Sequence, residues 1–376
     1  MPTTLADLLA DLVAIDSVNP SLVAGGAGEG EAAAFVAGWA REAGLGVQLL
    51  EATPGRPSVV VRARGTGCGR SLLLCGHLDT VGVEGMRDRG PRVVEDRLYG
   101  RGAYDMKAGV VAALMACREA AGLGLAGDVI VAAVADEEHA SLGVRETLAT
   151  VHADAAIVTE PTELELVVAH KGFVWAEIEV TGRAAHGSRP QLGLDAIVKA
   201  GPILTALGAL DEALGGRTHP LLGRGSVHAS TIRGGKELSS YPPDCVIGVE
   251  RRTLPGDGAA DVEAELAALL DACRRDDPQL RAEARMLLVR EPFEVPADAG
   301  IAAVVRAAAA DVLGAPPPTT GASYWADAAF IAATGIPTVM FGPVGEGAHA
   351  AEEWVSLAST EAVARTLVAV AARVCA

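Results

Sequence analysis

Residues 72–81 read LLLCGHLDTV, and they give the clearest indication of the fold. A short leucine-rich run ends at a glycine, and the polar residues His77 and Asp79 follow directly. Such a run is typical of a strand that is buried on both faces, as in a parallel sheet covered by helices. His77 then lies at the carboxyl end of the strand, where ligand sites gather in α/β sheets. Asp79 is placed to hydrogen-bond the imidazole from behind and fix its tautomer.

Other short apolar runs, separated by helical patterns, extend this interpretation to a whole α/β domain. Each run is bounded by glycine or by charged residues, as buried strands are. The helical patterns repeat their apolar residues at intervals of three and four, and Thr3 or Thr4 is positioned to cap the first helix. Strands that alternate with helices predict a mostly parallel sheet. The expected strands are 58–61, 129–135 and 155–158, and the expected helices are 5–13, 29–43, 106–121 and 141–150.

The pattern changes near residue 171, where apolar and polar side chains begin to alternate. Phe173 and Trp175 alternate with Val174 and Ala176, which is typical of an antiparallel sheet with one solvated face. The elements that follow complete the β-α-β-β-α-β order of a ferredoxin-like unit. They are a helix over 191–214, strands over 225–233 and 245–251, a helix over 259–275 and a strand over 280–289.

The domain prediction is therefore a split catalytic domain rather than two domains in tandem. Residues 1–170 plus 291–376 form the larger α/β domain, and residues 171–290 form the inserted α+β domain. The length of 376 residues suits either two domains or one large domain with an insertion. The change from buried runs to alternating ones, and back after Pro292, favours the insertion.

Composition excludes several classes of function. The formal net charge of −17 is a poor match for nucleic-acid phosphates or anionic membranes. Hydrophobic residues make up 50% of the chain, which is too many for disorder, and no stretch approaches the roughly 20 apolar residues of a membrane span. The start, MPTTLADLLADL, lacks the basic region of a signal peptide. Six scattered cysteines without a CxxC pair favour reduced thiols and a cytoplasmic location.

Side chains that bind metals recur at other strand ends and helix starts of the larger domain. Taken singly, each has an ordinary structural explanation, such as a helix N-cap or a solvated face. Together they would crowd at the carboxyl edge of one sheet and repel one another unless cations lie between them. Imidazole and carboxylate ligands without thiolate suit Zn²⁺, with Co²⁺ or Mn²⁺ as substitutes. These residues are Asp105, Glu137, Glu138, Glu160 and His349.

Five strings in the chain resemble, in order and spacing, the M20 metallopeptidase family. That family includes acetylornithine deacetylase, succinyl-diaminopimelate desuccinylase, aminoacylase and glutamate carboxypeptidase. The resemblance covers nearly the whole chain, and it implies a dizinc, aminopeptidase-like catalytic domain with an inserted lid and dimerisation domain. The strings are GHLDTV (76–81), GRGAYDMKAG (100–109), DEEH (136–139), TEPT (159–162) and FGPVGEGAHAAEEWV (341–355).

The resemblance implies a ligand set for two zinc ions. His77 and Glu160 would bind one ion, Glu138 and His349 would bind the other, and Asp105 would bridge both. Two metal ions can polarise a carbonyl and lower the pKa of a water between them.

The resemblance also implies which acidic residues take part without binding metal. Glu137 would be the general base that takes a proton from the water and passes it to the leaving nitrogen. Asp79 would support His77. Because neighbouring side chains at a strand end point in different directions, Glu137 and its neighbour Glu138 can divide the two tasks.

In the insertion and the loop beyond it, the resemblance suggests further candidates. His186 would reach the partner subunit's site in a homodimer and hold the developing oxyanion. Arg252 would hold the substrate carboxylate with its guanidinium fork. Ser240 stands where the family often has asparagine, Glu250 replaces the usual aspartate, and Gly321 aligns with a loop that lines the substrate pocket. These departures leave the metal ligands unchanged but bear on the substrate.

We therefore predict a zinc-dependent hydrolase that cleaves the amide of an N-acyl amino acid, as a deacetylase or desuccinylase does. The alternative within the family is a carboxypeptidase or dipeptidase acting on a short peptide. A non-catalytic ligand-binding relative would be expected to lose the base or a ligand, yet all are present. Nucleotide-binding and serine-hydrolase motifs are absent from the sequence.

Overall fold

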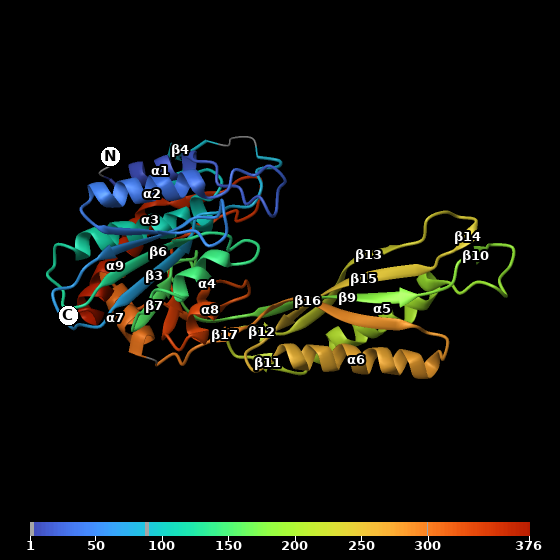
Figure 1. The fold of residues 1–376 in the computed structure, drawn as a ribbon. Helices are drawn as coiled ribbons and strands as arrows, with labels where there is room; N and C mark the ends of the chain where they lie inside the picture. Colours follow the sequence, from blue (N-terminus) through green and yellow to red (C-terminus); the bar gives the residue numbers. More distant parts are fainter. Residues whose placement is uncertain (1–3, 87–89, 299) are drawn as a thin grey trace. The chain divides into compact units, whose positions relative to one another are not determined.

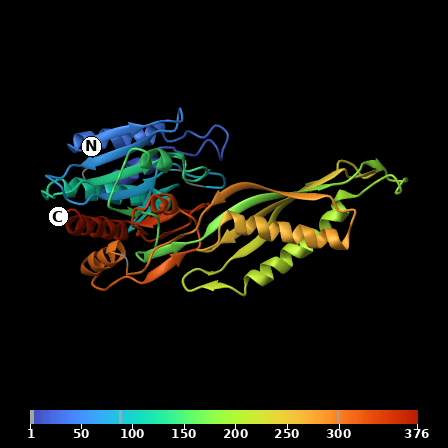
Figure 2. The ribbon, with the colours of Figure 1, turned by 60° about the horizontal axis from the view of Figure 1, so that its bottom comes forward.

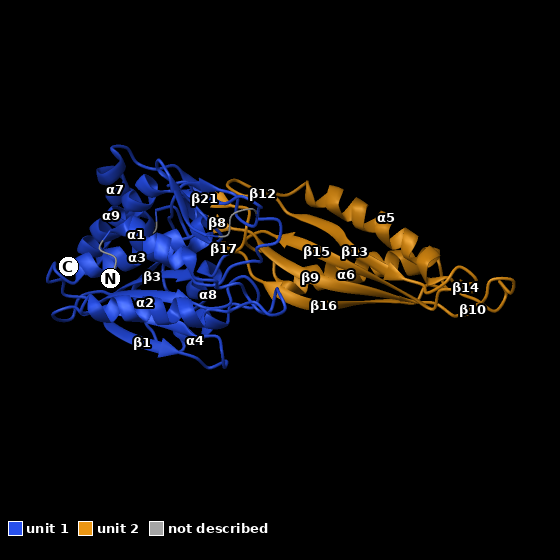
Figure 3. Ribbon diagram, turned by 90° about the horizontal axis from the view of Figure 1, so that it is seen from above, with its two compact units in different colours: residues 1–168, 295–320, 326–376 blue, residues 169–294, 321–325 orange. Residues whose placement is uncertain are grey.

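The computed structural model describes residues 4–86, 90–298 and 300–376, and the chain divides into two compact units (Figure 3). Unit 1 comprises residues 1–168, 295–320 and 326–376, and unit 2 comprises residues 169–294 and 321–325. The predicted insertion, 171–290, lies within unit 2, which also contains the short segment 321–325. The larger unit is thus assembled from segments that are far apart in the sequence.

Unit 1 is built on a mixed sheet whose centre is parallel, which confirms the predicted α/β class (Figure 1). Parallel pairing joins the four central strands, and the outer strands pair antiparallel. Every residue of β3, β6 and β7 is buried, as the continuous apolar runs predicted. The sheet has nine strands, and seven of them follow one another in the order β1 (Gly46–Leu50), β2 (Ser58–Ala63), β6 (Val129–Val134), β3 (Leu72–His77), β7 (Ala155–Val158), β19 (Thr338–Met340) and β8 (Leu166–His170). The other two, β17 (Phe293–Glu294) and β18 (Thr319–Ala322), pair with β8.

Helices cover both faces of this sheet (Figures 1 and 2). Alternate residues of the strands, such as Leu72 and Leu74, pack together with apolar residues of five helices, and they form one large apolar core. Two short helices pack against β6 and β19 and against each other, outside that core. The five helices are α1 (Leu5–Ala14), α2 (Gly30–Glu42), α3 (Ala108–Ala120), α7 (Gly300–Leu313) and α9 (Leu357–Val374), and the two short ones are α4 (Leu142–Leu148) and α8 (Ala328–Ala333).

Two helix starts show how local chemistry sets the boundaries. Thr4 caps α1, since its side chain accepts a hydrogen bond from the N–H of Asp7; the alternative cap, Thr3, lies outside the described residues. The helix predicted from residue 191 instead begins at Ala196, as α5 (Ala196–Leu214). Asp195 caps it, and Gly193 before it lies so close to the ring of Tyr241 that a Cβ would stand 2.5 Å away.

Unit 2 contains a four-stranded antiparallel sheet in the order β13–β15–β9–β16, with two helices on one face (Figure 1). Val174 and Ala176 of β9 are buried against the helices, whereas Phe173 and Trp175 alternate onto the other face. This order and connectivity match the ferredoxin-like unit predicted from the sequence. The bounds are β9 (Gly172–Thr181), β13 (Ser226–Gly234), β15 (Asp244–Thr253), β16 (Ala282–Arg290) and α6 (Ala259–Asp276).

Short strands complete both units. In unit 1, β20 (Gly345–Glu346), β21 (Trp354–Ser356), β5 (Arg97–Tyr99) and β4 (Arg92–Val94) form a second, antiparallel sheet. In unit 2, β10 (Ala185–His186) pairs with β14 (Ser240–Tyr241), β11 (Thr218–His219) pairs with β12 (Gly223–Arg224), and β17 (Phe293–Glu294) pairs with residues 169–170. Among the described residues, none of the helices has the length and apolarity needed to cross a membrane.

Candidate metal centre

Two groups of metal-type side chains meet in unit 1, and they share one carboxylate. His77, Asp105 and Glu160 form the first group, and Asp105, Glu138 and His349 form the second; in each group the candidate ligand atoms lie within 4.8 Å of one another. His77 Nε2 lies 3.2 Å from Asp105 Oδ1, and His349 Nε2 lies 3.3 Å from Asp105 Oδ2. The two oxygens of Asp105 therefore face different histidines, as a bridging carboxylate requires.

The parallel centre of the sheet brings these residues together. His77 ends β3, Glu138 lies four residues beyond the end of β6, and Glu160 lies two residues beyond the end of β7. Because β3 is the middle strand of the three and all run parallel, these residues emerge at one edge. Asp105 lies in the tight segment Ala103–Lys107 that precedes α3, and its own backbone is not helical (φ −110°, ψ 95°). His349 lies in the loop between β20 and β21, with a left-handed φ of 62°.

Two glycines permit the close packing behind Glu160. A Cβ on Gly109 would lie 2.0 Å from the backbone oxygen of Thr159, and one on Gly342 would lie 1.9 Å from the backbone oxygen of Glu160. No side chain fits at either position. The start of α3 and the segment after β19 therefore approach the Glu160 strand end directly.

The carboxyl groups of the site are crowded together, so their negative charges are stabilised by positive charges nearby. Burial raises the pKa of Glu137 and of Glu160 well above the usual carboxyl value, and nearby carboxylates add to the shift. Hydrogen bonds to Asp105 and Glu138 raise the pKa of His349 to about 10. Burial opposes the protonation of His77, but its bond to Asp105 and the surrounding carboxylates raise its pKa overall. In a site without a metal, the imidazolium charges offset the carboxylates.

The donor set fits a pair of divalent cations. Each group offers one imidazole nitrogen and two carboxylates, and no cysteine belongs to either group. Such mixed nitrogen and oxygen donors suit Zn²⁺, Co²⁺ or Mn²⁺. The side chains of His77, Glu138 and Glu160 are at most 8% exposed, so the charges they carry are poorly solvated and gain from a bound cation.

Glu137 is placed differently from the ligand candidates. It belongs to neither group, yet its Oε2 lies 4.0 Å from His77 Nε2, and its side chain is 10% exposed. A carboxyl that is this little exposed, beside a candidate ligand but outside both groups, suits the role of a general base.

Asp79 contacts His77 in a way the sequence did not predict. His77 Nδ1 lies 2.9 Å from the backbone carbonyl of Asp79, whereas the Asp79 carboxylate oxygen is 3.8 Å away. The expected carboxylate–imidazole hydrogen bond is therefore wrong, because the carbonyl occupies the imidazole N–H. The carboxylate instead accepts the backbone N–H groups of Glu137 (3.1 Å) and Glu138 (3.2 Å), and so holds the turn that carries both residues.

The sequence profile of Peptidase family M20/M25/M40 matches residues 73–373. The chain belongs to this family. An acetylornithine deacetylase from Myxococcus xanthus is 33% identical over 289 residues, which is 74% of this chain and 73% of the relative. One from Proteus mirabilis is 31% identical over 343 residues, or 87% and 85% of the two chains. The chain is accordingly an amidohydrolase or peptidase of the M20 family.

Solved structures of M20 proteins share the fold. A tripeptidase from Staphylococcus aureus superposes with a TM-score of 0.80 at 19% identity, covering 99% of this chain and 98% of that one. A metallo-carboxypeptidase from Sulfolobus solfataricus gives 0.78 at 18% identity, covering 98% of both chains. A dinuclear metal-binding peptidase from Bacillus subtilis gives 0.75 at 14% identity, covering 99% and 97%. At such identities these likenesses concern the fold alone.

One residue of this M20 site was missed by the sequence analysis. Glu353 is 1% exposed, and its carboxylate accepts the backbone N–H groups of Gly102 (3.0 Å), Tyr104 (2.9 Å) and Asp105 (3.0 Å). It also pairs with Arg101 at 2.7 Å. Glu353 therefore fixes the turn that presents the shared carboxylate. The sequence offered one indication of this role: Glu353 stands next to Trp354, in the same string as His349.

A buried polar network behind the candidate ligands was also missed. Asn19 is fully buried, and its amide donates to Asp79 at 2.8 Å and to Asp136 at 3.0 Å. Arg56 pairs with Asp136 at 2.7 Å and with Glu29 at 2.6 Å. These residues stand far apart in the sequence, so no spacing could have revealed them. Together they hold the strand ends that carry His77 and the Glu137–Glu138 pair.

The candidates in unit 2 fall into three places. His186 and Ser240 are direct partners in the β10–β14 ladder, so the structure brings these two together. Arg252 lies on β15 and pairs with Glu250 at 2.7 Å. A Cβ on Gly321 would lie 2.5 Å from the side chain of Leu222, so close packing alone explains a glycine at this position.

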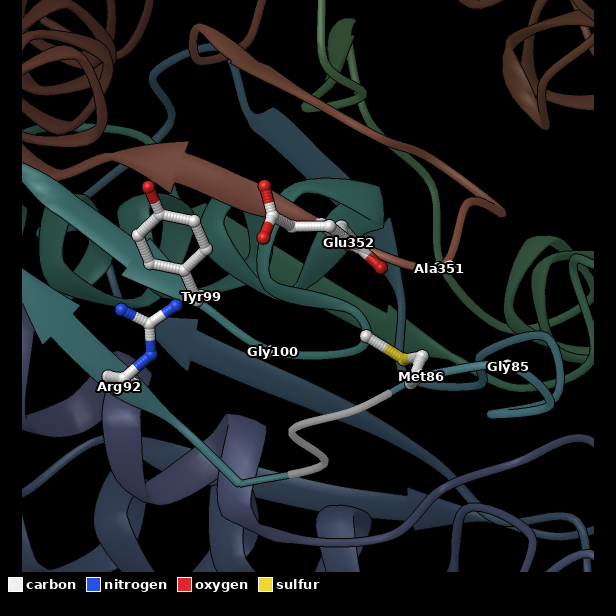
Figure 4. Close-up of a pocket in the computed structure, with 8 residues that line it drawn as sticks. Gly85, Met86, Arg92, Tyr99, Gly100, Ala351 and Glu352 are labelled. Atoms are coloured by element: carbon white, nitrogen blue, oxygen red, sulfur yellow. The ribbon is translucent and has the colours of Figure 1, made fainter.

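A cavity of about 460 Å³ in unit 1 lies beside the Glu353 segment (Figure 4). Its lining includes Met86, Tyr99 and Glu352, and Arg92 stacks on the Tyr99 ring with 4.3 Å between guanidinium carbon and ring centroid. None of the predicted ligands or the predicted base lines it. The cavity therefore does not include the two candidate ligand groups that share Asp105.

Proposed function

We propose that this chain is a dinuclear metal-dependent amidohydrolase that removes the acyl group from an N-acyl amino acid. The observation that carries the proposal is that two groups of candidate ligands share Asp105 beside Glu137, a carboxyl that is only 10% exposed and belongs to neither group. The relatives named acetylornithine deacetylase support the deacylase branch.

Glu138 and His349 would hold one divalent cation, His77 and Glu160 the other, and Asp105 both. Cations bound there would supply electrophilic polarisation of the scissile carbonyl and a more acidic water. Glu137 takes a proton from the attacking water and delivers it to the leaving nitrogen, so the amine departs neutral. A carboxyl whose pKa is raised by burial is suited to both directions of this transfer.

The substrate would be held through residues of unit 2. Arg252 is 33% exposed, so part of its guanidinium is available to a substrate carboxylate even though Nε pairs with Glu250. We further propose that Ser240 contributes a polar contact from the same strand pair as His186. Gly321 would line the pocket only through its backbone.

A homodimer through unit 2 is part of the proposal. β13 is an edge strand of the unit 2 sheet, and Ile232 on it is 54% exposed. On α5, Ile197 and Val198 are 44% and 67% exposed. An unpaired strand edge and exposed apolar residues are features that a second copy would cover. His186, which is exposed at the β10–β14 ladder, would then act in the site of the partner subunit.

We also infer a reducing, cytoplasmic location. All six cysteines are free, and five of them are buried. A small-molecule amide or peptide substrate, rather than nucleic acid or a lipid surface, agrees with the net charge of −17.

The second candidate is an exopeptidase of the same family. It is favoured by the fold neighbours, which include a tripeptidase and a metallo-carboxypeptidase. The same residues would perform the same proton transfers on a peptide bond. The two candidates therefore differ in the leaving group and in the pocket, not in the metal ligands.

One assay separates the two candidates. Purified protein with added Zn²⁺, Co²⁺ or Mn²⁺ is offered a panel of N-acetyl and N-succinyl amino acids beside a panel of dipeptides and tripeptides. We expect hydrolysis of N-acyl amino acids and a metal content near two ions per chain. Hydrolysis of peptides alone would establish the exopeptidase, and inactivity on both panels with full metal content would overturn the proposed function.

A further inference from the structure

Three chain segments that carry candidate ligands meet at the side chain of Tyr104. Tyr104 directly precedes Asp105, and its hydroxyl donates a hydrogen bond to Oε1 of Glu163. Glu163 lies three residues after the candidate ligand Glu160. The same oxygen, Oε1, accepts the backbone N–H of Gly345 at 3.4 Å. One carboxylate oxygen therefore joins the segment before α3 and the segment after β7 to the start of the loop between β20 and β21.

The ring of Tyr104 also lies directly against the start of that loop. A Cβ on Gly345 would stand 2.4 Å from the ring carbon Cδ2 and 2.4 Å from the backbone oxygen of Trp354. Only glycine fits between an aromatic ring on one side and the backbone of β21 on the other. The ring contact and the hydrogen bond to Glu163 therefore fix Gly345, which lies four residues before His349.

Glu163 has a backbone conformation that residues other than glycine rarely adopt. Its φ is 56° and that of Leu164 is 59°, so two consecutive non-glycine residues are left-handed. Their backbone N–H groups donate to the carbonyls of Pro343 (3.3 Å) and Gly342 (3.0 Å), which keeps the turn in place. Such conformations cluster at functional sites, where the surrounding structure enforces them. The turn therefore holds the Glu163 carboxylate beside Tyr104 through backbone contacts of its own.

His349 is the most exposed of the candidate ligands. Its side chain is 55% exposed, against 1% for His77, which ends a buried strand. The β21 end of its loop is anchored where Arg101 donates to the backbone oxygen of Ala350 at 2.8 Å and pairs with Glu353 at 2.7 Å. The position of His349 depends on anchors at both ends of the loop, and the contacts of Tyr104 form the anchor at the β20 end.

We propose that Tyr104 and Glu163 form a latch that holds the β20–β21 loop and so positions His349 for its metal ion. The inference rests on the proposed function, in which two ions are bound and one of them has His349 among its ligands. A loop that is not held must be ordered when the ion binds, and this cost lowers the affinity. Neither latch residue is a ligand in the proposed site, so both are positioning residues. Breaking the latch should weaken the ion bound by His349 and spare the other ion.

Stepwise removal of zinc from the full-length, metal-loaded protein tests the inference. Each protein is dialysed against buffers of decreasing free Zn²⁺ concentration, and the ions that remain are counted by elemental analysis. Tyr104→Phe keeps the ring but loses the hydroxyl. Glu163→Gly removes the carboxylate, and glycine adopts the left-handed backbone without strain. We expect each variant to bind one ion about 10-fold more weakly than the wild type and the other ion as tightly.

Two further variants separate the latch from a general loss of structure. Glu163→Gln offers the same acceptor oxygen to the Tyr104 hydroxyl and to the Gly345 N–H, so it should retain zinc nearly as the wild type does. In a His349→Ala background, Glu163→Gly should leave the retention of the remaining ion unchanged, because the loop no longer carries a ligand. Circular dichroism of the loaded proteins checks that each variant is folded.

Unchanged zinc retention in either Tyr104→Phe or Glu163→Gly, equal weakening of both ions, no rescue by Glu163→Gln, or a further loss in the His349→Ala background would each overturn the inference. The dialysis needs no substrate, so the inference and the proposed function fail by different results. Inactivity on both substrate panels with two ions bound overturns the proposed hydrolase and leaves the latch standing. A wild-type protein that never holds two ions overturns the dinuclear site, and the inference with it.

Discussion

The carboxylate of Glu353 accepts the backbone N–H of Asp105 at 3.0 Å, so an acid outside both ligand groups holds the residue that joins them. Glu353→Gln keeps the side-chain volume but turns one acceptor into a donor, which faces N–H groups that are themselves donors. We expect divalent-metal affinity to fall by about 10–100-fold. Zinc titration by calorimetry measures this, and unchanged affinity would contradict the positioning role.

The same variant should also lose stability. Arg101 is 6% exposed and would be left beside a neutral amide, so we expect the free energy of unfolding to fall by about 1–3 kcal/mol. The matched control is Glu352→Gln, which changes an exposed neighbour and should leave both zinc affinity and urea unfolding near wild type.

Glu137→Gln is expected to abolish turnover while the metal content stays near two ions per chain. The amide cannot take the proton of the attacking water, yet Glu137 belongs to neither ligand group. The comparison is Glu138→Gln, which removes a ligand and should lower the metal content instead. Elemental analysis and the acyl-amino-acid assay report on both variants. Activity retained in Glu137→Gln would refute the assignment of the base.

Asn19→Ala tests the network behind the strand ends. The variant leaves the buried carboxylates of Asp79 and Asp136 without their shared amide donor. We expect the free energy of unfolding to fall by about 1–3 kcal/mol in urea melts. Gln48→Ala, at an exposed position of β1, is the control and should change stability by less than about 0.5 kcal/mol. Equal stability of the two variants would show that the network is dispensable.

Periodic patterns in the sequence predicted the long elements well, and short elements escaped prediction. The alternation from Phe173 onward predicted β9 because ten residues repeat with one period. The sheet formed by β4, β5, β20 and β21 was missed, since strands of two or three residues are too short to show a period. The pairing of β5 with β21 that completes the sheet also joins segments about 255 residues apart, since Tyr99 lies opposite Trp354 (354 − 99).

The same contrast holds at the metal centre. His77 and Glu160 could be placed because each follows an apolar strand, and parallel strands end at one edge. The group of Asp79 that contacts His77 could not be predicted, because the choice between the backbone carbonyl and the carboxylate depends on backbone geometry. Asn19 and Glu353 act through contacts with residues distant in sequence, which a spacing argument cannot supply.

The proposed action of His186 in the site of the partner subunit predicts complementation between inactive subunits. In a homodimer with each His186 acting in the partner's site, a His186→Ala subunit joined to a Glu137→Gln subunit has one complete site. Equal mixing, with exchange of subunits, should restore about a quarter of the wild-type activity, because half of the dimers are mixed and each has one working site of two.

His186→Ala should leave folding unchanged, since the side chain is exposed. The control mixes His186→Ala with a His186→Ala, Glu137→Gln double variant, which has no complete site in any dimer. Recovery no greater than in this control, with mixed dimers shown by mass spectrometry, would place the action of His186 within its own subunit or outside catalysis.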